Sequence, residues 1–438
     1  MGTLCYDTKV IEYEGIKYLI GKSRYTNSSV LCGFANPEDK EKEISVKLPP
    51  CDIIGDSAFE GCKTKEFILH EGVININEKA FKDCINLKNF NFVSSVNIIC
   101  ESVFENSGLI HITVPKTVDM VAPRIFQNCK DLKTAEFFAN SNTVPVGCFF
   151  GCKSLESIKL SKQTSISNEA FFKTGFKSLD FNDFPNIESI GPMSFCACSN
   201  LVDLIISKNI KIIDSNAFAS CKKLKNAKIE PGVESMMFSI FTGTAIEELT
   251  LPESIVRASS SCEGMTNLKK ATIKTKLNML PCNFFMNCMN LEEVVFENNI
   301  KVFCQNAFYN TGIKFFKVPD TVQSVEHNCF CKCENLKELI FTNKGPVRFI
   351  ESSIKDNKNL KTVIILSKEP SLGGLNFGNS PNLSSIILKK DAISKEYSFI
   401  SKYNDLLKDL SIDEILTNHS YNEINKIEDV INEVGEMK

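Results

Sequence analysis

One motif returns throughout the sequence and constrains the fold more than any other feature. In its clearest copy Phe81 is the anchor, with Ile76 five residues before it, Cys84 three after it and Leu87 six after it, followed by apolar residues nine and eleven after it. The frame fits fifteen units, whose anchors are Phe59, Phe81, Phe104, Phe126, Phe149, Phe171, Phe195, Phe218, Phe241, Cys262, Phe285, Phe308, Phe330, Ile354 and Phe377. The fourteen intervals from the first anchor to the last span 318 residues, a mean of about 22.7. This period is typical of a solenoid, in which each unit buries its apolar face only by stacking on its neighbours.

The motif also predicts the structure inside each unit. The last two apolar positions are two residues apart, which is the spacing of a short strand with both side chains inward. A second extended segment, such as 73–76, leads to the anchor, which we expect in a turn or a short helical piece. The pattern therefore predicts a repeat solenoid of about 15 coils, mainly β with short helical turns.

The two ends of the chain lie outside the period. Residues 1–43 contain a hairpin pattern at 10–20, a third strand pattern at 29–34 and a charged loop at 37–43, and we expect them to form a β capping region. The solenoid then covers 44–390. Residues 391–438 predict a helical, acidic tail, with amphipathic patterns at 391–410 and 421–434. Two interpretations of this tail stay open: it caps the last coil, or it docks on a partner.

Charge and hydropathy exclude several classes of function. The net charge of −3 gives no general attraction to nucleic acid or an anionic membrane. The sequence has no apolar run of about 18 residues, so no transmembrane segment is expected. Residues 1–22 lack the continuous apolar core of a signal peptide. We therefore expect a cytoplasmic protein, and the alternative is a cell-surface location reached by an unconventional route.

The chain has nineteen cysteines, and many of them share one repeat position. Eight lie three residues after an anchor: Cys62, Cys84, Cys129, Cys152, Cys198, Cys221, Cys288 and Cys333. Other units place Ser, Thr or Met there, which indicates a packing position for a small buried side chain. A disulfide framework is the alternative, because stacked coils bring equivalent residues about 5 Å apart. The odd total and the missing signal peptide favour free thiols.

Catalytic and metal-binding patterns are weak. The sequence has four histidines and no Ser-His-acid motif, phosphate loop or dinucleotide fingerprint. The best metal candidate is the segment 327–333, which contains His327 and Cys331. Zinc needs about four convergent ligands, but Cys333 belongs to the packing position. We expect no catalytic residue, no metal and no cofactor, and therefore no enzyme.

Three copies of the motif carry a resemblance to a known family. These are 55–62 (GDSAFEGC), 80–87 (AFKDCINL) and 217–224 (AFASCKKL). They resemble the BspA-like class of leucine-rich repeat proteins, and the resemblance covers about 44–390, while 14–20 resembles the N-terminal cap of that family. The resemblance implies a solenoid with a concave strand face and no catalysis. It also implies a surface or secreted protein that attaches to host or matrix proteins.

One coil departs from the frame. The interval from Phe241 to Cys262 is only 21 residues, and Arg257 falls on the interior position. An unpaired buried Arg is very costly, so we expect the backbone to slip and turn Val256 inward. A local bulge and a binding feature both remain open for this coil.

The outward positions of the strands indicate where a partner binds. Each strand places one residue between its two inward ones, and most of these residues are polar in the first ten strands. The last five are Val295, Lys317, Ile340, Ile364 and Ile387, with Phe315 two residues before Lys317. A contiguous apolar stripe on a surface usually marks an interaction site. Strand propensity alone, or cover by the C-terminal tail, would also explain the stripe.

These observations predict a non-catalytic scaffold that binds a protein partner on its concave strand face, inside the cell or within a larger assembly. The alternative is a cell-surface or released adhesin or antigen that binds host or matrix proteins.

Overall fold

The computed structural model describes residues 5–343, 345–367, 370–372, 375 and 377–388, and the backbone of 407–409. The chain divides into two units, Met1–Val233 and Glu234–Lys438, called here the first and second units. Its fold is a β-solenoid of about 15 turns. Among the described residues the only helical segments are two short 3-10 helices, η1 (Pro37–Glu41) and η2 (Phe181–Asp183).

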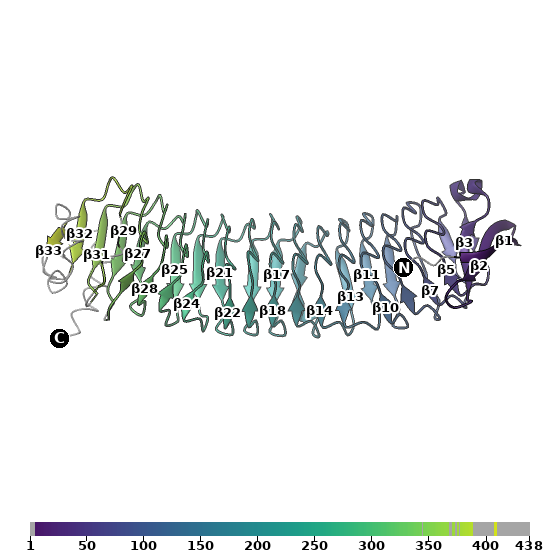
Figure 1. Ribbon diagram of the computed structural model, residues 1–438, viewed down its shortest axis with the longest axis horizontal. Helices are drawn as coiled ribbons and strands as arrows, with labels where there is room; N and C mark the ends of the chain where they lie inside the picture. The colour runs from purple at the N-terminus through teal and green to yellow at the C-terminus, as the bar shows by residue number, and fades with distance from the viewer. Residues whose placement is uncertain are drawn as a thin grey trace. The chain divides into compact units, whose positions relative to one another are not determined.

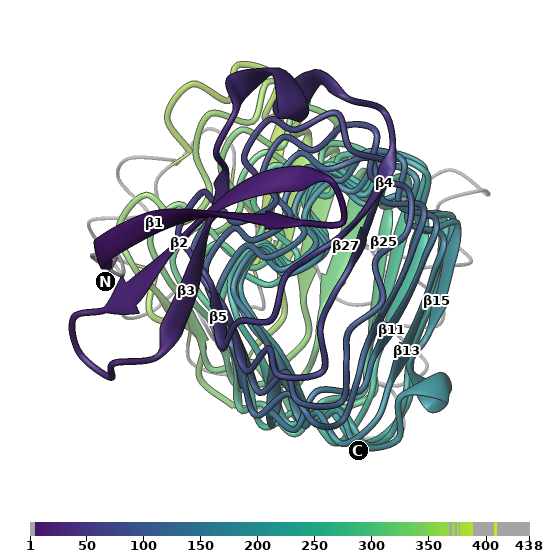
Figure 2. The same ribbon diagram turned by 90° about the vertical axis from the view of Figure 1, so that its right-hand side faces the viewer.

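A three-stranded cap opens the first unit. Strands β1 (Cys5–Tyr13) and β2 (Ile16–Ser23) form an antiparallel hairpin, and β3 (Ser29–Phe34) pairs antiparallel with β2. This confirms the predicted hairpin and third strand. Strand β3 then pairs in parallel with β5 (Ile53–Ile54), so the cap continues into the sheets of the coils (Figure 2). The boundaries 1–43, 44–390 and 391–438 stay predictions.

Most coils of the first unit contribute a longer strand and a shorter strand, on different walls (Figures 1 and 2), whereas residues 87–93 of the Phe81 coil form no strand. The longer strands are β4 (Ser45–Lys47), β6 (Glu66–Ile68), β9 (His111–Val114), β11 (Thr134–Phe137), β13 (Ser157–Leu160), β15 (Ser178–Asp180), β17 (Asp203–Ile206) and β19 (Asn226–Ile229). The shorter strands are β5, β7 (Asn75–Ile76), β8 (Ile98–Ile99), β10 (Met120–Val121), β12 (Thr143–Val144), β14 (Ser165–Ile166), β16 (Ser189–Ile190) and β18 (Ile212–Ile213). Paired strands of successive coils run parallel, as stacking of like units requires.

The second unit repeats this arrangement. Its longer strands are β21 (Glu248–Leu251), β23 (Lys270–Ile273), β25 (Glu293–Phe296), β27 (Phe315–Val318), β29 (Glu338–Phe341), β31 (Thr362–Ile365) and β32 (Ser385–Leu388). Its shorter strands are β20 (Ser235–Met236), β22 (Arg257–Ala258), β24 (Met279–Leu280), β26 (Val302–Phe303), β28 (Ser324–Val325) and β30 (Arg348–Phe349). The longer strands form two parallel sheets, β21–β23–β25 and β27–β29–β31–β32.

The anchor residues form the core of each unit. The rings of Phe149 and Phe171 stack with centroids 5.4 Å apart, and those of Phe308 and Phe330 stack at 5.0 Å. These four side chains are buried. Equivalent rings therefore lie one coil apart along the stack, as the repeat predicts.

A tight corner of the backbone holds each anchor. Lys79 and Asp83, two residues on either side of Phe81, have left-handed φ values of 58° and 59°. The same flanking pair surrounds every anchor except Cys262 and Phe377, which keep only the second member. Left-handed residues cannot continue an α-helix, so the predicted short helical pieces at the anchors are turns instead.

The irregular coil slips in the direction opposite to the one predicted. Strand β22 pairs with β20 so that Arg257 lies opposite Ser235 and Ala258 opposite the buried Met236. Arg257 is exposed, and Val256 is 48% exposed. The expectation that Val256 turns inward is therefore wrong. Ala258 takes the interior position, and the coil shortens between this residue and Cys262.

The predicted C-terminal helix is not supported. Residues Leu407–Asp409, inside the predicted helix 391–410, form strand β33, which pairs in parallel with β32. An open sheet edge presents unpaired backbone groups, and a further strand satisfies them. The rest of 391–438, including the second predicted helix, lies outside the described residues.

Candidate protein-binding surface

From β9 to β13 the outward row of the first unit is polar and hydrogen-bonded. Parallel pairing aligns Thr113 of β9, Glu136 of β11 and Lys159 of β13. Thr113 Oγ1 donates to Glu136 Oε2 at 3.2 Å, and Lys159 Nζ lies 2.8 Å from Glu136 Oε1. The hydrogen bond from Lys159 lowers the pKa of the Glu136 carboxyl. This part of the strand face is a solvated surface, and a hollow of about 250 Å³ beside it is lined by Asn91, His111 and Thr113 among others.

The outward row of the second unit changes character along β27–β29–β31–β32. The register aligns Lys317, Ile340, Ile364 and Ile387, while Val295 lies on β25 in the other sheet. Lys317 is exposed and Val295 is half-buried. Ile340, Ile364 and Ile387 are only 8%, 2% and 0% exposed. Because the structure holds a single chain, its own atoms bury these three outward side chains.

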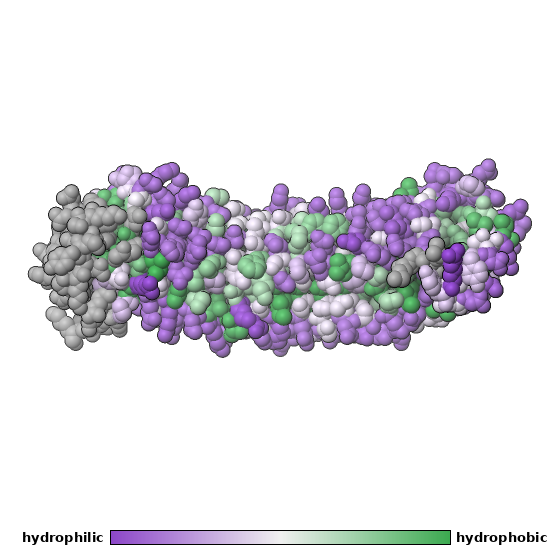
Figure 3. Space-filling model, in the orientation of Figure 1, coloured by the Kyte–Doolittle hydropathy of each residue, from purple (hydrophilic) through white to green (hydrophobic). Residues whose placement is uncertain are grey.

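The exposed border of this row carries an aromatic ring and basic groups. Phe315 of β27 is 38% exposed. Lys337 Nζ lies 5.9 Å from the centroid of its ring, within the range of a cation–π contact. Lys317 follows two residues later on the same strand. On the side shown in Figure 3, apolar residues are scattered among hydrophilic ones, which is ordinary for a protein surface.

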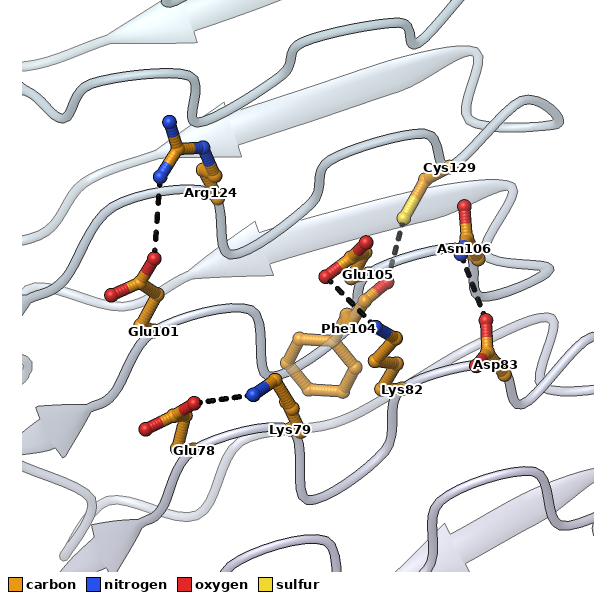
Figure 4. A network of polar contacts seen from close by, with 10 residues as sticks. All are labelled: Glu78, Lys79, Lys82, Asp83, Glu101, Phe104, Glu105, Asn106, Arg124 and Cys129. Atoms are coloured by element: carbon orange, nitrogen blue, oxygen red, sulfur yellow. Dashed lines mark hydrogen bonds and ion pairs between the residues drawn. The ribbon is translucent and has the colours of Figure 1, made fainter. Parts of the chain in front are cut away.

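The shared cysteine position is a hydrogen-bonding position. Cys129 Sγ donates to the carbonyl oxygen of Phe104, the anchor of the preceding coil, at 3.0 Å (Figure 4). The same bond to the preceding anchor recurs at Cys84, Cys152, Cys198, Cys221, Cys288 and Cys333. None of the nineteen cysteines, all within the described residues, forms a disulfide.

Polar residues on the corner outside the Phe81 anchor join neighbouring coils (Figure 4). Asn106 Nδ2 donates to Asp83 Oδ1 at 2.8 Å, and Lys82 Nζ lies 3.4 Å from Glu105 Oε2. Asp83 and Asn106 are left-handed residues flanking successive anchors. Sequence reasoning missed this column, although Asn, Asp, Ser and Gly recur at the position and tolerate such a backbone.

The residues of the metal candidate contact different backbone carbonyls. His327 Nδ1 lies 2.9 Å from Glu351 O, Cys331 Sγ donates to Ser352 O at 3.0 Å, and Cys333 Sγ donates to Phe308 O. Throughout the part of the chain that the structure describes, no three His, Cys, Asp or Glu side chains group as metal ligands would. The same residues include no helix long and apolar enough to cross a membrane.

Parallel coils, a strand at the same place in most of them and a stacked apolar column define a leucine-rich repeat solenoid. Residues 52–177, 143–266, 188–314 and 301–428 match the model of the BspA type leucine-rich repeat region. The chain therefore belongs to the BspA-type leucine-rich repeat family, as the resemblance predicted.

Among solved structures, a leucine-rich repeat protein from Bacteroides ovatus is 19% identical, with a TM-score of 0.61 over 93% of this chain and 100% of that one. A leucine rich cell surface protein from Faecalibacterium prausnitzii is 15% identical over 92% and 98%, with a TM-score of 0.40. The pneumococcal vaccine antigen PcpA is 17% identical over 92% and 97%, with a TM-score of 0.37. The first likeness supports the fold and nothing finer. No curated protein sequence matches the chain.

Proposed function

We propose that this chain is a non-catalytic scaffold that binds a protein partner through the outward strand face of its second unit. The partner site contains the exposed Phe315 and Lys317 and the half-buried Val295 at its border, continued by the row Ile340, Ile364 and Ile387. The observation that carries the proposal is Phe315, an aromatic ring 38% exposed on a strand whose neighbours turn apolar side chains to the same face.

The chemistry of the border suggests the kind of partner segment. A few residues supply most of the binding energy in many interfaces, and large aromatic side chains are often among them because they bury a large surface. Lys317 and Lys337 add positive charge beside Phe315. A partner segment with an apolar side chain next to a carboxylate would match both features.

The buried part of the row requires a second step. Ile340, Ile364 and Ile387 are covered by the chain itself, so a partner reaches them only by displacing that cover. Strand β33 (Leu407–Asp409) pairs with β32 and extends this sheet by one strand. We propose that the cover of these three side chains moves aside when a partner binds.

Thiol chemistry supports an intracellular location. All nineteen cysteines are without a disulfide, and Cys282 is exposed. Exposed thiols persist in the reducing cytosol and are oxidised outside it. A membrane-impermeant maleimide applied to intact cells would label Cys282 only if the chain lies at the surface, which would favour the adhesin alternative over a cytoplasmic scaffold.

Site-specific photo-crosslinking tests the binding surface. A photoreactive residue replaces Phe315 in one variant and Ile68 in another, because Ile68 is an outward strand residue of the first unit with 43% exposure. In the source cell we expect a discrete crosslinked protein at 315 and none at 68. Lys317→Glu should weaken the crosslink at 315 by reversing a border charge. Equal crosslinking at both positions, or none at 315, would contradict the proposed site.

A further inference from the structure

Two cysteines of the N-terminal cap meet across a strand. Cys5 of β1 and Cys32 of β3 place their Sγ atoms 3.3 Å apart. Strand β2 lies between β1 and β3 and pairs with both. Side chains on two strands that are not neighbours are normally about 10 Å apart, so this contact needs a local cause.

Gly21 and a bulge supply that cause. Gly21 of β2 lies beneath the two thiols and has no side chain, and a Cβ there would lie 3.4 Å from Cys5 Cβ and 3.0 Å from Thr8 Cγ2. Strand β3 bulges between Leu31 and Gly33, which leaves Cys32 as the extra residue. Bulged residues change the direction of a side chain, and Cys32 reaches over the glycine.

This pair differs from the cysteines of the coils. Cys129 and Cys152 are fully buried, and each donates to the carbonyl of a preceding anchor. Cys5 and Cys32 are only half-buried. Thiol–disulfide exchange requires access of the oxidant to a sulfur atom, and the cap pair offers that access while the buried cysteines of the shared repeat position do not.

We propose that Cys5 and Cys32 are an oxidation site, where a low-molecular-weight disulfide such as oxidised glutathione converts the two thiols into a disulfide that ties β1 to β3. In the first step the Cys5 thiolate attacks one sulfur of the small disulfide, a mixed disulfide forms, and one small thiolate leaves. In the second step the Cys32 thiolate attacks Cys5 Sγ and releases the second small thiol. Two protein thiols are oxidised, one small disulfide is reduced to two thiols, and their protons balance.

The order of the steps follows from the surroundings of Cys32. Burial, followed by the neighbouring Cys5 thiol, raises the pKa of Cys32 to about 12. Cys32 is therefore a poor first nucleophile, and it acts after Cys5 has formed the mixed disulfide. The bond requires the sulfurs to approach to about 2.05 Å. Strand β1 can supply the movement because it lies at the sheet edge and its pairing is interrupted between Tyr6 and Lys9.

The disulfide would fasten an exposed edge strand, β1, to β3, the second strand in from the edge. The residues of β1 are mostly exposed. The bond would close a loop between residues 27 apart in sequence. Closing a loop of this size restricts the detached state, so we expect local opening of β1 to become on the order of 100-fold rarer.

The test uses the full-length protein in a buffer of oxidised and reduced glutathione. After acid quenching, alkylation and tryptic digestion, we expect the peptides 1–9 and 25–40 to be linked through Cys5 and Cys32, while Cys152 stays alkylated as a thiol. Tryptic cleavage of the native protein after Lys9 should slow on the order of 100-fold upon oxidation and recover with dithiothreitol.

Three variants separate the proposal from general oxidation. Cys32→Ser should trap glutathione on Cys5, and Cys5→Ser should leave Cys32 as a thiol and remove the protection of β1. Gly21→Ala, which crowds Thr8 and Tyr6, should slow formation of the link. Glutathione on both cysteines without a link, or a link that forms only after denaturation, would overturn the proposal. If the disulfide forms but tryptic cleavage after Lys9 does not slow, the proposal that the bond holds β1 in place is wrong.

Discussion

Strands β9, β11 and β13 of the first unit and strands β27, β29, β31 and β32 of the second share one inner pattern but differ on their outward side. Ile112 and Val114 of β9 point inward and are buried. Leu339 and Phe341 of β29 also point inward and are buried. Outward, Thr113 is exposed whereas Ile340 is 8% exposed. The inner column therefore specifies the coil in both regions, and the outward row is free to take another role.

The outward row has two physical roles in these regions. In the first, polar side chains satisfy one another and water. In the second, the outward residues are apolar and form a second buried layer on the other side of the sheet. These residues are therefore part of the core. A strand buried on both faces loses the alternation of apolar and polar residues, and the sequence of β31 and β32 shows this loss.

The largest expected effect tests whether the inner columns are equivalent. Phe218 stacks on Phe195 at 5.4 Å and Phe308 stacks on Phe330 at 5.0 Å, and all are buried. Phe218→Ala and Phe308→Ala should each cost about 3–5 kcal/mol through lost transfer energy and a cavity. Denaturant unfolding with a probe in each unit would measure this, and Ile85→Ala, at an exposed position, is the control. If the unfolding midpoint of either Phe variant is unchanged, the inner columns of the two units are not equivalent.

The next effect compares the same residue type in the two outward rows. Ile364 is 2% exposed and Ile68 is 43% exposed. Ile364→Ala should cost about 2–4 kcal/mol, and Ile68→Ala less than about 1 kcal/mol. Thermal unfolding of both variants measures the difference. Equal losses would show that the outward row of the second unit is not a buried layer.

Much of the fold could be predicted because the apolar positions of the repeat indicate which side chains are buried. Anchor positions such as Phe81, the inward pair of most strands and the shared cysteine position follow from spacing alone, and the structure confirms them. The alternation of apolar and polar residues indicates which side of a strand faces the interior, but it does not indicate what covers the other side. The burial of Ile364 and Ile387 therefore could not be predicted, although a covered stripe was one of the alternatives.

The errors arose where backbone geometry decides the outcome. Residues 391–410 have a helical spacing of apolar residues, but pairing of Leu407–Asp409 with β32 takes precedence over that pattern. At the irregular coil the sequence indicated a slip but not its direction, and Cys262, like Phe377, lacks the first left-handed residue that the other anchors have. The proximity of Cys5 and Cys32 depends on a bulge, which leaves no periodic signal.

A pH series sharpens the comparison between inner and outward positions. Burial raises the pKa of Cys51 and Cys288 to about 12, so the folded state retains their protons longer than the unfolded state does. Their contribution to stability is complete below about pH 8.5 and is lost as the pH rises toward 12. Each thiol should remove about 1 kcal/mol of stability per pH unit in this window. Cys288→Ser keeps a donor for the carbonyl of Cys262 and should lower the slope, whereas an unchanged slope would contradict the assignment.

The smallest expected effect lies in the outward row of the first unit. Lys159 Nζ lies 2.8 Å from Glu136 Oε1, but the lysine side chain is 73% exposed, and an exposed ion pair contributes little to stability. We expect Lys159→Ala to leave the unfolding midpoint unchanged while the pKa of Glu136, which the hydrogen bond from Lys159 lowers, rises toward its usual range. An NMR titration of the Glu136 carboxyl measures this directly, and salt near 1 M should weaken the contribution of Lys159 in the unaltered protein. A clear loss of stability in Lys159→Ala would mean that the polar row helps to hold the coils together. If only the pKa moves, the row contributes no measurable stability, and its residues can vary to suit a partner without cost to the fold.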